Sequence, residues 1–283
     1  MERNVAVVVT YNRLDKLKCN LNCLLSQTVK LYKIIVVDNC SSDGTESYLA
    51  EMTKKYSNIE VKRTSSNIGG SGGFNLGVKT AYDDGADYIW GMDDDAYPRP
   101  DALEKLIISR NKYGNQNAYW SNCNNDNDFS NDVKTVNIWM FVGFYIGRNI
   151  IDKIGFPRGD FFIYYDDSEY ADRIIKNKFN IYKVKDSIID HQDAVGNVAF
   201  QITWFGKKIN ILKLPDSNWR LYYLVRNDIL RFSYRDIRKY KIIVIRSGIR
   251  FFKVLFFSPK QIPIFMKGYY HGLIGLSGKT MSP

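Results

Sequence analysis

The sequence predicts an α/β fold with a mostly parallel central sheet, followed by a basic helical region. Residues 5–10, 34–38 and 88–92 are continuous apolar runs without polar alternation, which favours strands buried on both faces. Segments with apolar residues at helical spacing separate these runs, and such alternation is typical of a parallel sheet covered by helices. We therefore expect an α/β domain over residues 1–202 and a helical region over residues 203–283.

The elements of the expected domain follow one another closely. Strands are expected at residues 5–10, 34–38, 59–61 and 88–92, and helices at residues 14–25, 45–56 and 74–83. Residues 67–73 are expected to form a glycine-rich loop, and the Asn- and Asp-rich residues 111–132 an irregular surface excursion. A short helix ending at Gly155, a helix beginning near Asp166 and a short strand leading to His191 complete the domain.

The positive charge of the chain is concentrated in its tail. The 283 residues carry a net charge of +10, but residues 201–283 hold 16 Lys/Arg against 3 Asp/Glu, and residues 1–200 hold 24 against 27. In residues 229–257, Arg and Lys alternate with Ile, Val and Phe at roughly helical spacing. This pattern predicts a helix that lies on an anionic membrane surface. An ordinary amphipathic helix packed on the α/β domain is the alternative interpretation.

Other classes of protein are not favoured by the composition. The four cysteines show neither CxxC spacing nor a zinc pattern, so we expect reduced thiols. No apolar run approaches the roughly 18–20 residues that a membrane span needs. The first residues do not resemble a signal peptide. These features predict a cytoplasmic protein, peripheral on the inner face of the cell membrane.

Three consecutive carboxylates follow the apolar run at residues 88–92. Adjacent carboxylates repel one another, and a divalent cation relieves that cost. If the strand continues through residues 93–95, Asp93 and Asp95 point the same way, because side chains alternate along a strand. Two oxygen ligands on one face suit Mn²⁺ or Mg²⁺, with substrate phosphates completing the coordination. A solvated acidic turn is the alternative.

Polar residues stand at the ends of several predicted strands. Thr10, Asp38, Asn67 and Asp93 all fall at such positions, and parallel sheets bind ligands at the carboxyl ends of their strands. The glycine-rich segment that begins at Asn67 lets the backbone approach a diphosphate closely, although it matches neither G-x-G-x-x-G nor a P-loop. We therefore expect one cleft to collect these residues.

A second acidic pair follows the aromatic run at residues 161–165. Asp166 stands where a helix N-cap is expected. Asp167, backed by aromatic residues and a second acid, is interpreted as a catalytic base with a raised pKa. His191 follows a short strand and can complete a metal site with the preceding acids, since Mn²⁺ accepts imidazole.

These motifs, in this order, resemble the inverting glycosyltransferases of family 2, which have the GT-A fold. The resemblance rests on VVTYNR at residues 8–13, VDNCSSDGT at residues 37–45 and DDD at residues 93–95, the last matching the DXD metal motif of the family. Within the family, NIGGSGGF at residues 67–74 and the acidic pair followed by a distant histidine resemble the galactofuranosyltransferases.

The resemblance implies roles for the residues of the expected cleft. Nucleotide-sugar contacts are implied for six residues: Thr10, Arg13, Asp38, Asn67, Gly70 and Asp94. Mn²⁺ or Mg²⁺ would be held by Asp93, Asp95 and His191. The base would be Asp167, with Trp139 and Asp166 on the acceptor side.

The predicted function is metal-dependent, inverting transfer of a hexose. The donor is expected to be UDP-galactofuranose, and the acceptor a lipid-linked saccharide of cell-surface polysaccharide synthesis. A rhamnosyltransferase that uses dTDP-rhamnose is the first alternative. A basic protein that binds nucleic acid or membranes without catalysis is another, but it leaves the acidic clusters unexplained. A catalytically inactive membrane-bound scaffold is the last, and we expect no nucleic acid partner.

Overall fold

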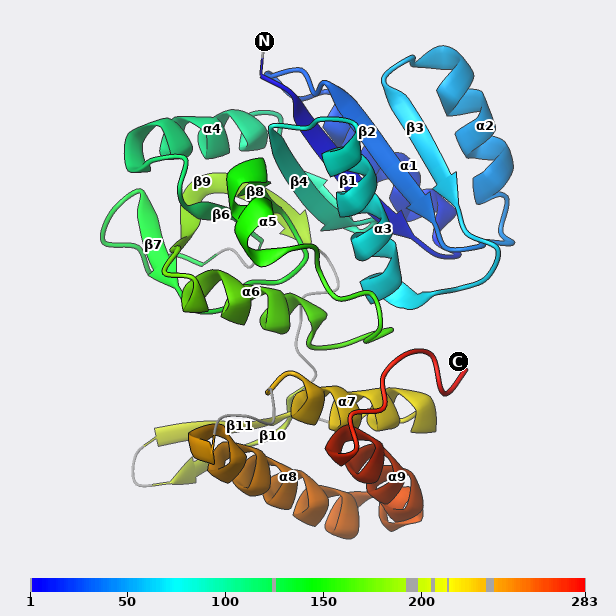
Figure 1. Ribbon diagram of the computed structural model, residues 1–283, viewed down its shortest axis with the longest axis vertical. Helices are drawn as coiled ribbons and strands as arrows, with labels where there is room; N and C mark the ends of the chain where they lie inside the picture. The colour runs from blue at the N-terminus through cyan, green and yellow to red at the C-terminus, as the bar shows by residue number, and fades with distance from the viewer. Residues whose placement is uncertain are drawn as a thin grey trace. The chain divides into compact units, whose positions relative to one another are not determined.

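The computed structural model describes residues 2–123, 126–191, 198–204, 207–212, 214–232 and 237–282. The chain separates into two compact units (Figure 1). The N-terminal unit comprises residues 1–162 and 166–192, and the C-terminal unit comprises residues 163–165 and 193–283. The division after residue 192 falls ten residues before the domain end expected from the sequence, and it assigns three residues of the acidic-pair region to the C-terminal unit.

Four parallel strands form the first half of the sheet in the N-terminal unit. They run in the order β3-β2-β1-β4. Their bounds are Asn4–Thr10 for β1, Lys33–Asp38 for β2, Ile59–Arg63 for β3 and Tyr88–Asp93 for β4. Every residue of β1 is buried, which explains its apolar run without alternation. The predicted parallel α/β architecture is confirmed.

Helices α1 (Leu14–Leu25), α2 (Thr45–Lys55) and α3 (Gly69–Asp83) connect these strands. Figure 1 shows α3 crossing in front of the sheet. The prediction of a loop over residues 67–73 was wrong, because α3 already begins at Gly69. A Cβ on Gly73 would lie 2.5 Å from Val9 Cγ1, and one on Gly77 would lie 2.4 Å from Val7 Cγ1. These two glycines therefore allow the helix to pack closely on β1, rather than making the chain flexible.

The second half of the sheet extends the order to β4-β8-β6-β9-β5, with β7 paired to β9. Its elements are β5 (Ala96–Pro98), α4 (Ala102–Tyr113), β6 (Ala118–Asn122), β7 (Val133–Val136), β8 (Phe144–Gly147), α5 (Arg148–Ile154), α6 (Asp166–Lys176) and β9 (Ile181–His191). The predicted helix end at Gly155, helix start at Asp166 and strand before His191 all agree with these bounds.

The region 111–132 is more regular than its polar composition predicts. It contains the end of α4 and all of β6, whose five residues are buried. The polar residues of β6 are satisfied inside the sheet: Ser121 Oγ lies 2.9 Å from Ser187 Oγ, and Asn122 Nδ2 donates to the carbonyl of Asp126 at 2.9 Å. The polar residues of β6 therefore looked like those of a loop, because their partners lie on a distant strand and in the loop that follows β6.

The C-terminal unit contains a two-stranded antiparallel sheet and three long helices. The strands are β10 (Val198–Trp204) and β11 (Lys207–Leu212), and the helical elements are α7 (Asn218–Leu230), α8 (Ile237–Phe257), η1 (Pro259–Gln261) and α9 (Ile262–Leu273). Gly268 and Gly272 let α9 approach α7 closely, since a Cβ there would lie 2.8 Å from Tyr222 O and 3.0 Å from Arg226 O. Helices α7, α8 and α9 agree with the helical character predicted for the C-terminal region. Strand β11 was not predicted there, and the helix expected over residues 229–257 is divided between α7 and α8.

Candidate active site

The carboxyl ends of β1, β2 and β4 meet at one edge of the sheet. Thr10 pairs with Asp38 across β1 and β2, and Val9 pairs with Asp93 across β1 and β4. Three of the residues expected in one cleft therefore lie side by side because the strands are parallel and in register. This is the edge at which parallel sheets bind ligands.

The acidic turn, residues 93–95, differs from the continuous strand assumed from the sequence. Strand β4 ends at Asp93, Asp94 and Asp95 form a turn, and β5 begins at Ala96. The alternation of a strand therefore does not set the directions of these side chains. Instead, the buried amide of Asn20 on α1 donates to Ala96 O at 2.6 Å and holds the turn.

Cations from the loop after β1 and the start of α1 face the acidic turn. Arg13 Nη1 lies 2.8 Å from Asp95 Oδ2 and 3.5 Å from Asp94 Oδ1, and Lys16 Nζ lies 3.7 Å from Asp95 Oδ2. Thr10 Oγ1 donates to Asp94 Oδ2 at 2.7 Å. These three partners of the turn come from the end of β1, the loop that follows it and the start of α1.

Histidine 191 reaches the same turn from the far end of the sheet. Strand β9 runs antiparallel to β5, and His191 pairs with Ala96, the residue that follows Asp95. His191 Nε2 lies 3.2 Å from Asp95 Oδ1. Its Nδ1 atom is buried and has no hydrogen-bond partner among the described residues. The sequence separation of 96 residues between Asp95 and His191 is closed by a single strand pair.

The three carboxyls of the turn have different pKa values. Burial, followed by the charges of Asp95 and Asp94, raises the pKa of Asp93 well above its ordinary value. Burial also raises the pKa of Asp94 to about 6, against the hydrogen bond from Thr10. Burial acts in the same direction on Asp95, but His191, Arg13 and Lys16 together lower the pKa of Asp95 below its ordinary value.

The donor set at the turn fits a divalent cation only in part. Among the described residues, no group of three His, Cys, Asp or Glu side chains is already arranged as a metal site. The Asp93 carboxylate, however, makes no hydrogen bond or ion pair to a described residue. Its pKa is raised by burial first and then by the like charges of Asp95 and Asp94, and a cation would relieve that repulsion. With Asp95 and the imidazole of His191 nearby, these are donors that Mn²⁺ accepts when substrate oxygens supply the remaining positions.

Asp38 and its neighbours lie where the nucleotide side of the cleft is predicted. The buried Asp38 carboxylate accepts a hydrogen bond from Ser41 N at 2.9 Å and pairs with the Arg63 guanidinium. The adjacent Asn39 Nδ2 donates to Gly69 O at 2.9 Å, which ties the end of β2 to the start of α3. Sequence analysis missed Arg63, although an arginine that ends the strand next to Asp38 was a usable signal.

The first turn of α3 is open where the resemblance places the sugar nucleotide. Asn67 Oδ1 accepts from Gly69 N at 2.8 Å, and a Cβ added to Gly70 would meet nothing within 4 Å. Gly69 itself is left-handed, with φ of 78°, and a Cβ there would overlap the backbone of Phe162. A helix N-terminus with an unobstructed Gly70 is suited to an approaching anion.

The second acidic pair begins α6. Asp166 is buried, and burial together with the charge of Asp167 raises the pKa of Asp166 to about 8. Asp166 also contributes to the raised pKa of Asp93, so the two acidic clusters lie within electrostatic reach. Asp167 is partly exposed, and its Oδ1 accepts from Ser168 N at 2.5 Å. A raised pKa is therefore found at Asp166, and the raised pKa expected for Asp167 stays a prediction.

Trp139 contacts the main chain of the second acidic pair. Its side chain is fully buried, and Nε1 donates to the main-chain carbonyl of Asp167 at 3.1 Å. The residue therefore contacts the predicted base through the backbone and exposes no surface in this structure. Its role toward an acceptor remains a prediction.

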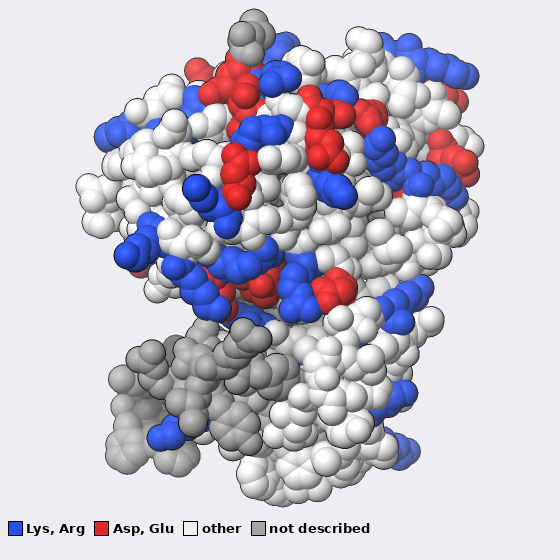
Figure 2. Space-filling view, in the orientation of Figure 1, with Lys and Arg blue, Asp and Glu red and all other residues white. Residues whose placement is uncertain are grey.

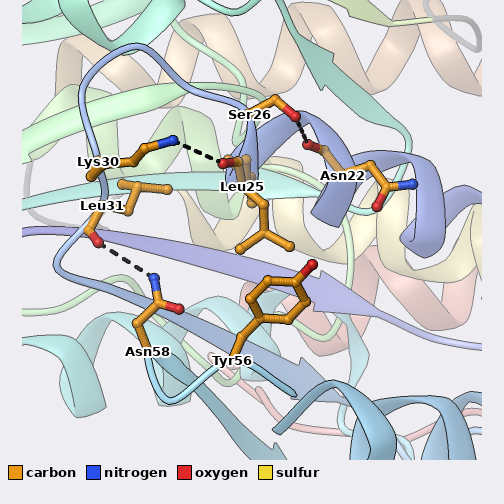
Figure 3. Close-up of a pocket in the computed structure, with 8 residues that line it drawn as sticks. Asn22, Leu25, Ser26, Lys30, Leu31, Tyr56 and Asn58 are labelled. Atoms are coloured by element: carbon orange, nitrogen blue, oxygen red, sulfur yellow. Dashed lines mark hydrogen bonds between the residues drawn. The ribbon is translucent and has the colours of Figure 1, made fainter.

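A pocket on the N-terminal unit lies away from all of these residues (Figure 3). It is formed by the C-terminal end of α1, the loop to β2 and the turn before β3, and Lys30 Nζ donates to Leu25 O within it at 3.4 Å. Its lining residues are Asn22, Leu24, Leu25, Ser26, Lys30, Leu31, Tyr56 and Asn58. The lining contains no carboxylate, and none of the predicted site residues belongs to it.

Comparisons with known proteins agree with this geometry. The profile of glycosyl transferase family 2 matches residues 5–170, more than half of the chain. A galactofuranosyltransferase, GlfT1 of Mycobacterium tuberculosis, is 38% identical over 112 residues, which are 38% of this chain and 36% of that protein. The aligned region thus spans about a third of the length of this relative. The dTDP-rhamnosyl transferase RfbF of Shigella flexneri is 24% identical over 255 residues, covering 81% of this chain and 80% of that protein.

Solved structures share the fold. The S. aureus protein TarS, residues 1–349 in complex with UDP-GlcNAc, superimposes with a TM-score of 0.64 at 16% identity, covering 97% of this chain and 81% of that one. The mannosyltransferase PcManGT from Pyrobaculum calidifontis, in complex with GDP-Man and Mn²⁺, gives a TM-score of 0.60 at 16% identity, covering 96% and 75%. At these identities the likeness establishes the GT-A fold and no more.

Proposed function

Because the chain belongs to glycosyl transferase family 2, we propose that it transfers a hexose from a nucleoside diphosphate sugar to an acceptor hydroxyl, with inversion at the anomeric carbon. The observation that carries this proposal is that two acidic clusters lie within electrostatic reach of each other, one paired with cations and one with a buried acid beside a second acid. The donor is UDP-galactofuranose in this proposal, in line with the similarity to a galactofuranosyltransferase.

Asp167 acts as the base in the proposed reaction. Its carboxylate removes the proton of the acceptor hydroxyl while the acceptor oxygen attacks the anomeric carbon. The bond from that carbon to the diphosphate breaks in the same displacement, and the nucleoside diphosphate leaves. Asp166, whose pKa of about 8 keeps it protonated at neutral pH, leaves Asp167 as the charged member of the pair.

The edge of the sheet orients the donor. In this proposal Asp38 and Thr10, which are paired across β1 and β2, contact the nucleoside, and the open start of α3 at Gly70 receives the diphosphate. Asp93, Asp95 and His191 would hold Mn²⁺ or Mg²⁺, which as a Lewis acid offsets the charge of the leaving diphosphate. Arg13, now paired with Asp95, is available to a phosphate when that carboxylate is otherwise engaged.

The C-terminal helices supply a surface for a lipid-linked acceptor. Several apolar side chains of α8 are exposed, among them Ile245 (62%), Phe252 (60%) and Phe256 (73%). Residues 237–283 contain nine Lys/Arg and no Asp or Glu. In Figure 2 the surface of this unit that is not grey is white and blue over α8 and α9. Exposed apolar groups among cations suit an anionic membrane surface. In the part of the chain that the structure describes, no helix is long and apolar enough to cross a membrane.

A rhamnosyltransferase that uses dTDP-rhamnose is the second candidate function. It is favoured by the similarity to the Shigella flexneri dTDP-rhamnosyl transferase, which extends over 81% of the chain and so includes part of the C-terminal region. The same residues would catalyse both reactions. The two reactions would differ in how the cleft binds the nucleobase and the sugar of the donor.

Calorimetric binding of UDP and of dTDP, each with Mn²⁺ and with EDTA, tests the proposal. We expect UDP to bind more tightly than dTDP, and only with the metal present. A preference for dTDP would replace the donor while keeping the mechanism. If folded protein binds neither nucleotide, the transferase proposal fails, and a membrane-binding role without catalysis becomes the better explanation of the basic tail.

A further inference from the structure

One buried side chain holds the acidic turn at both of its ends. Asn20 on α1 is fully buried, and its Nδ2 atom donates to Ala96 O at 2.6 Å and, more weakly, to Asp93 O at 3.5 Å. These two carbonyl groups flank Asp94 and Asp95 in the chain. A single amide group therefore restrains the main chain on either side of the two carboxylates.

The turn needs such a restraint because its side chains repel one another. Three adjacent carboxylates of like charge favour a more open arrangement of the chain that carries them. Strand β4 ends at Asp93 and β5 begins at Ala96, so the two residues between them lie outside both strands. Arg13 and Thr10 contact the carboxylates themselves, whereas Asn20 acts on the main chain.

Ala96 also joins the turn to β9. It pairs with His191 in the antiparallel ladder of β5 and β9, and His191 Nε2 lies 3.2 Å from Asp95 Oδ1. The hydrogen bond from Asn20 to Ala96 O therefore acts on the residue that connects Asp95 to the strand of His191. Loss of this bond would release the turn from α1 and leave it attached to β9 alone.

The stability of the core does not account for the amide of Asn20. Its Oδ1 atom is buried and has no hydrogen-bond partner among the described residues. A buried acceptor of this kind lowers stability, because the bond to water that it loses on folding is not replaced. Gln27, shortly after α1, is also buried, but its Nε2 donates to Arg99 O at 2.9 Å and its Oε1 accepts from Leu103 N at 3.1 Å. The contrast places the benefit of the Asn20 amide in the acidic turn.

We propose that Asn20 is a positioning residue for the acidic turn, which sets the directions of the Asp94 and Asp95 carboxylates and lowers the stability of the fold in doing so. Its effect on metal and donor binding rests on the proposed function, whereas the restraint on the turn does not. An apolar side chain of similar size at this position would leave the fold as stable as before. The turn would then no longer hold Asp95 against His191.

Asn20→Leu is the sharpest test, because leucine has a similar size and no polar atom. We expect a Tm within about 3 °C of the wild type, since removal of the unpaired oxygen and new apolar burial offset the lost hydrogen bonds. Amide hydrogen exchange in peptides covering residues 93–98 should become about fivefold faster or more, with exchange in β1 unchanged. The affinity for Mn²⁺, measured by calorimetry without nucleotide, should fall about tenfold or more.

Asn22→Leu is the matched control. Asn22 lies on the same helix but is exposed, and the substitution is the same. The Tm, the exchange over residues 93–98 and the affinity for Mn²⁺ should all remain those of the wild type. Because only the position differs, this variant separates the effect of the Asn20 amide from any effect of an added leucine on α1.

Three results with Asn20→Leu would overturn the inference: unchanged exchange over residues 93–98, a larger loss of Tm, or faster exchange with unchanged affinity in a protein that binds Mn²⁺. The larger loss of Tm would identify the amide as a stabilising group of the core. If the leucine variant does not fold, Asn20→Ala removes the amide without adding volume, and unchanged exchange or failure to fold in that variant counts equally against the inference. If the wild type binds neither Mn²⁺ nor nucleotide, the proposed function fails, and exchange over residues 93–98 then decides the restraint alone.

Discussion

The two acidic clusters of the N-terminal unit differ in how their charge is compensated. In the acidic turn, Asp95 meets Arg13, Lys16 and His191, and these partners lower its pKa below the ordinary value. At the start of α6, Asp166 is buried beside another acid, and its pKa rises to about 8. The first arrangement keeps a carboxylate charged and therefore able to bind cations. The second separates a protonated acid from a charged one and is suited to proton transfer.

The largest effect is expected from a substitution in the second cluster. Asp167→Asn should lower the rate of transfer by about 10²–10⁴-fold, because the amide cannot accept the acceptor proton. Nucleotide binding should remain, since the role proposed for Asp167 concerns the acceptor hydroxyl. Initial rates with calorimetric binding measure both properties. Asp83→Asn, an exposed change at the end of α3, is the control, and normal turnover by Asp167→Asn would remove this residue from the mechanism.

The second largest effect is expected from a substitution in the first cluster, the acidic turn. Asp95→Ala should weaken Mn²⁺-dependent binding of UDP by about tenfold or more, because it removes a charged ligand candidate and the partner of His191. Binding in EDTA should change little. Calorimetry under the two conditions gives the difference, and an equal loss with and without metal would assign Asp95 to the structure of the turn rather than to metal binding.

A third experiment tests the second cluster through the pH dependence of stability. Because the pKa of Asp166 is raised on folding, the contribution of Asp166 to the free energy of unfolding is fully present below the unfolded pKa of about 4. It is lost as pH rises towards about 8. Asp166→Asn lacks this loss. Its Tm relative to the wild type should therefore increase between pH 4 and pH 8, by about a few degrees. Thermal unfolding in EDTA measures the trend, and a constant difference across this range would contradict the buried, protonated state.

The smallest effect concerns a surface carboxylate with its cations already in place. Hydrogen bonds from Lys33 and Lys62 lower the pKa of Glu60 to about 2. A lowered pKa contributes stability above the unfolded value and loses it as pH falls towards 2. Glu60→Gln should cost less than about 1 kcal/mol at pH 7, since the group is partly exposed, and nothing at pH 2. Urea unfolding at the two pH values tests this, and an equal cost at both would exclude the ion pairs as its source.

Much of the site followed from local pattern. The apolar runs identified β1, β2 and β4, and a carboxylate after such a run had to stand at the carboxyl edge of a parallel sheet. His191 was found because it closes a strand-like run after two acidic clusters. These inferences hold because strand burial and strand polarity depend mainly on residues that are neighbours in sequence.

Other features of the fold and of the site could not be inferred from the local sequence pattern. The glycines of α3 indicate flexibility in sequence, but their reason is the approach of Val7 and Val9 from another element. Strand β6 resembled a loop because its polar partners lie on β9 and in the following loop. The raised pKa of Asp166 depends first on its burial, which the local sequence does not reveal.

The sequence by itself determined the fold class, the edge that holds the acids and the basic character of the C-terminal helices. Only the tertiary structure decided the contacts that tune those acids. Asn20 is 76 residues from Ala96, and Tyr165 is 85 residues from Arg250, yet each pair is joined by a hydrogen bond. The reason is physical: hydrogen-bond partners and the burial of single polar side chains are set by residues that folding brings together, and local periodicity does not encode them.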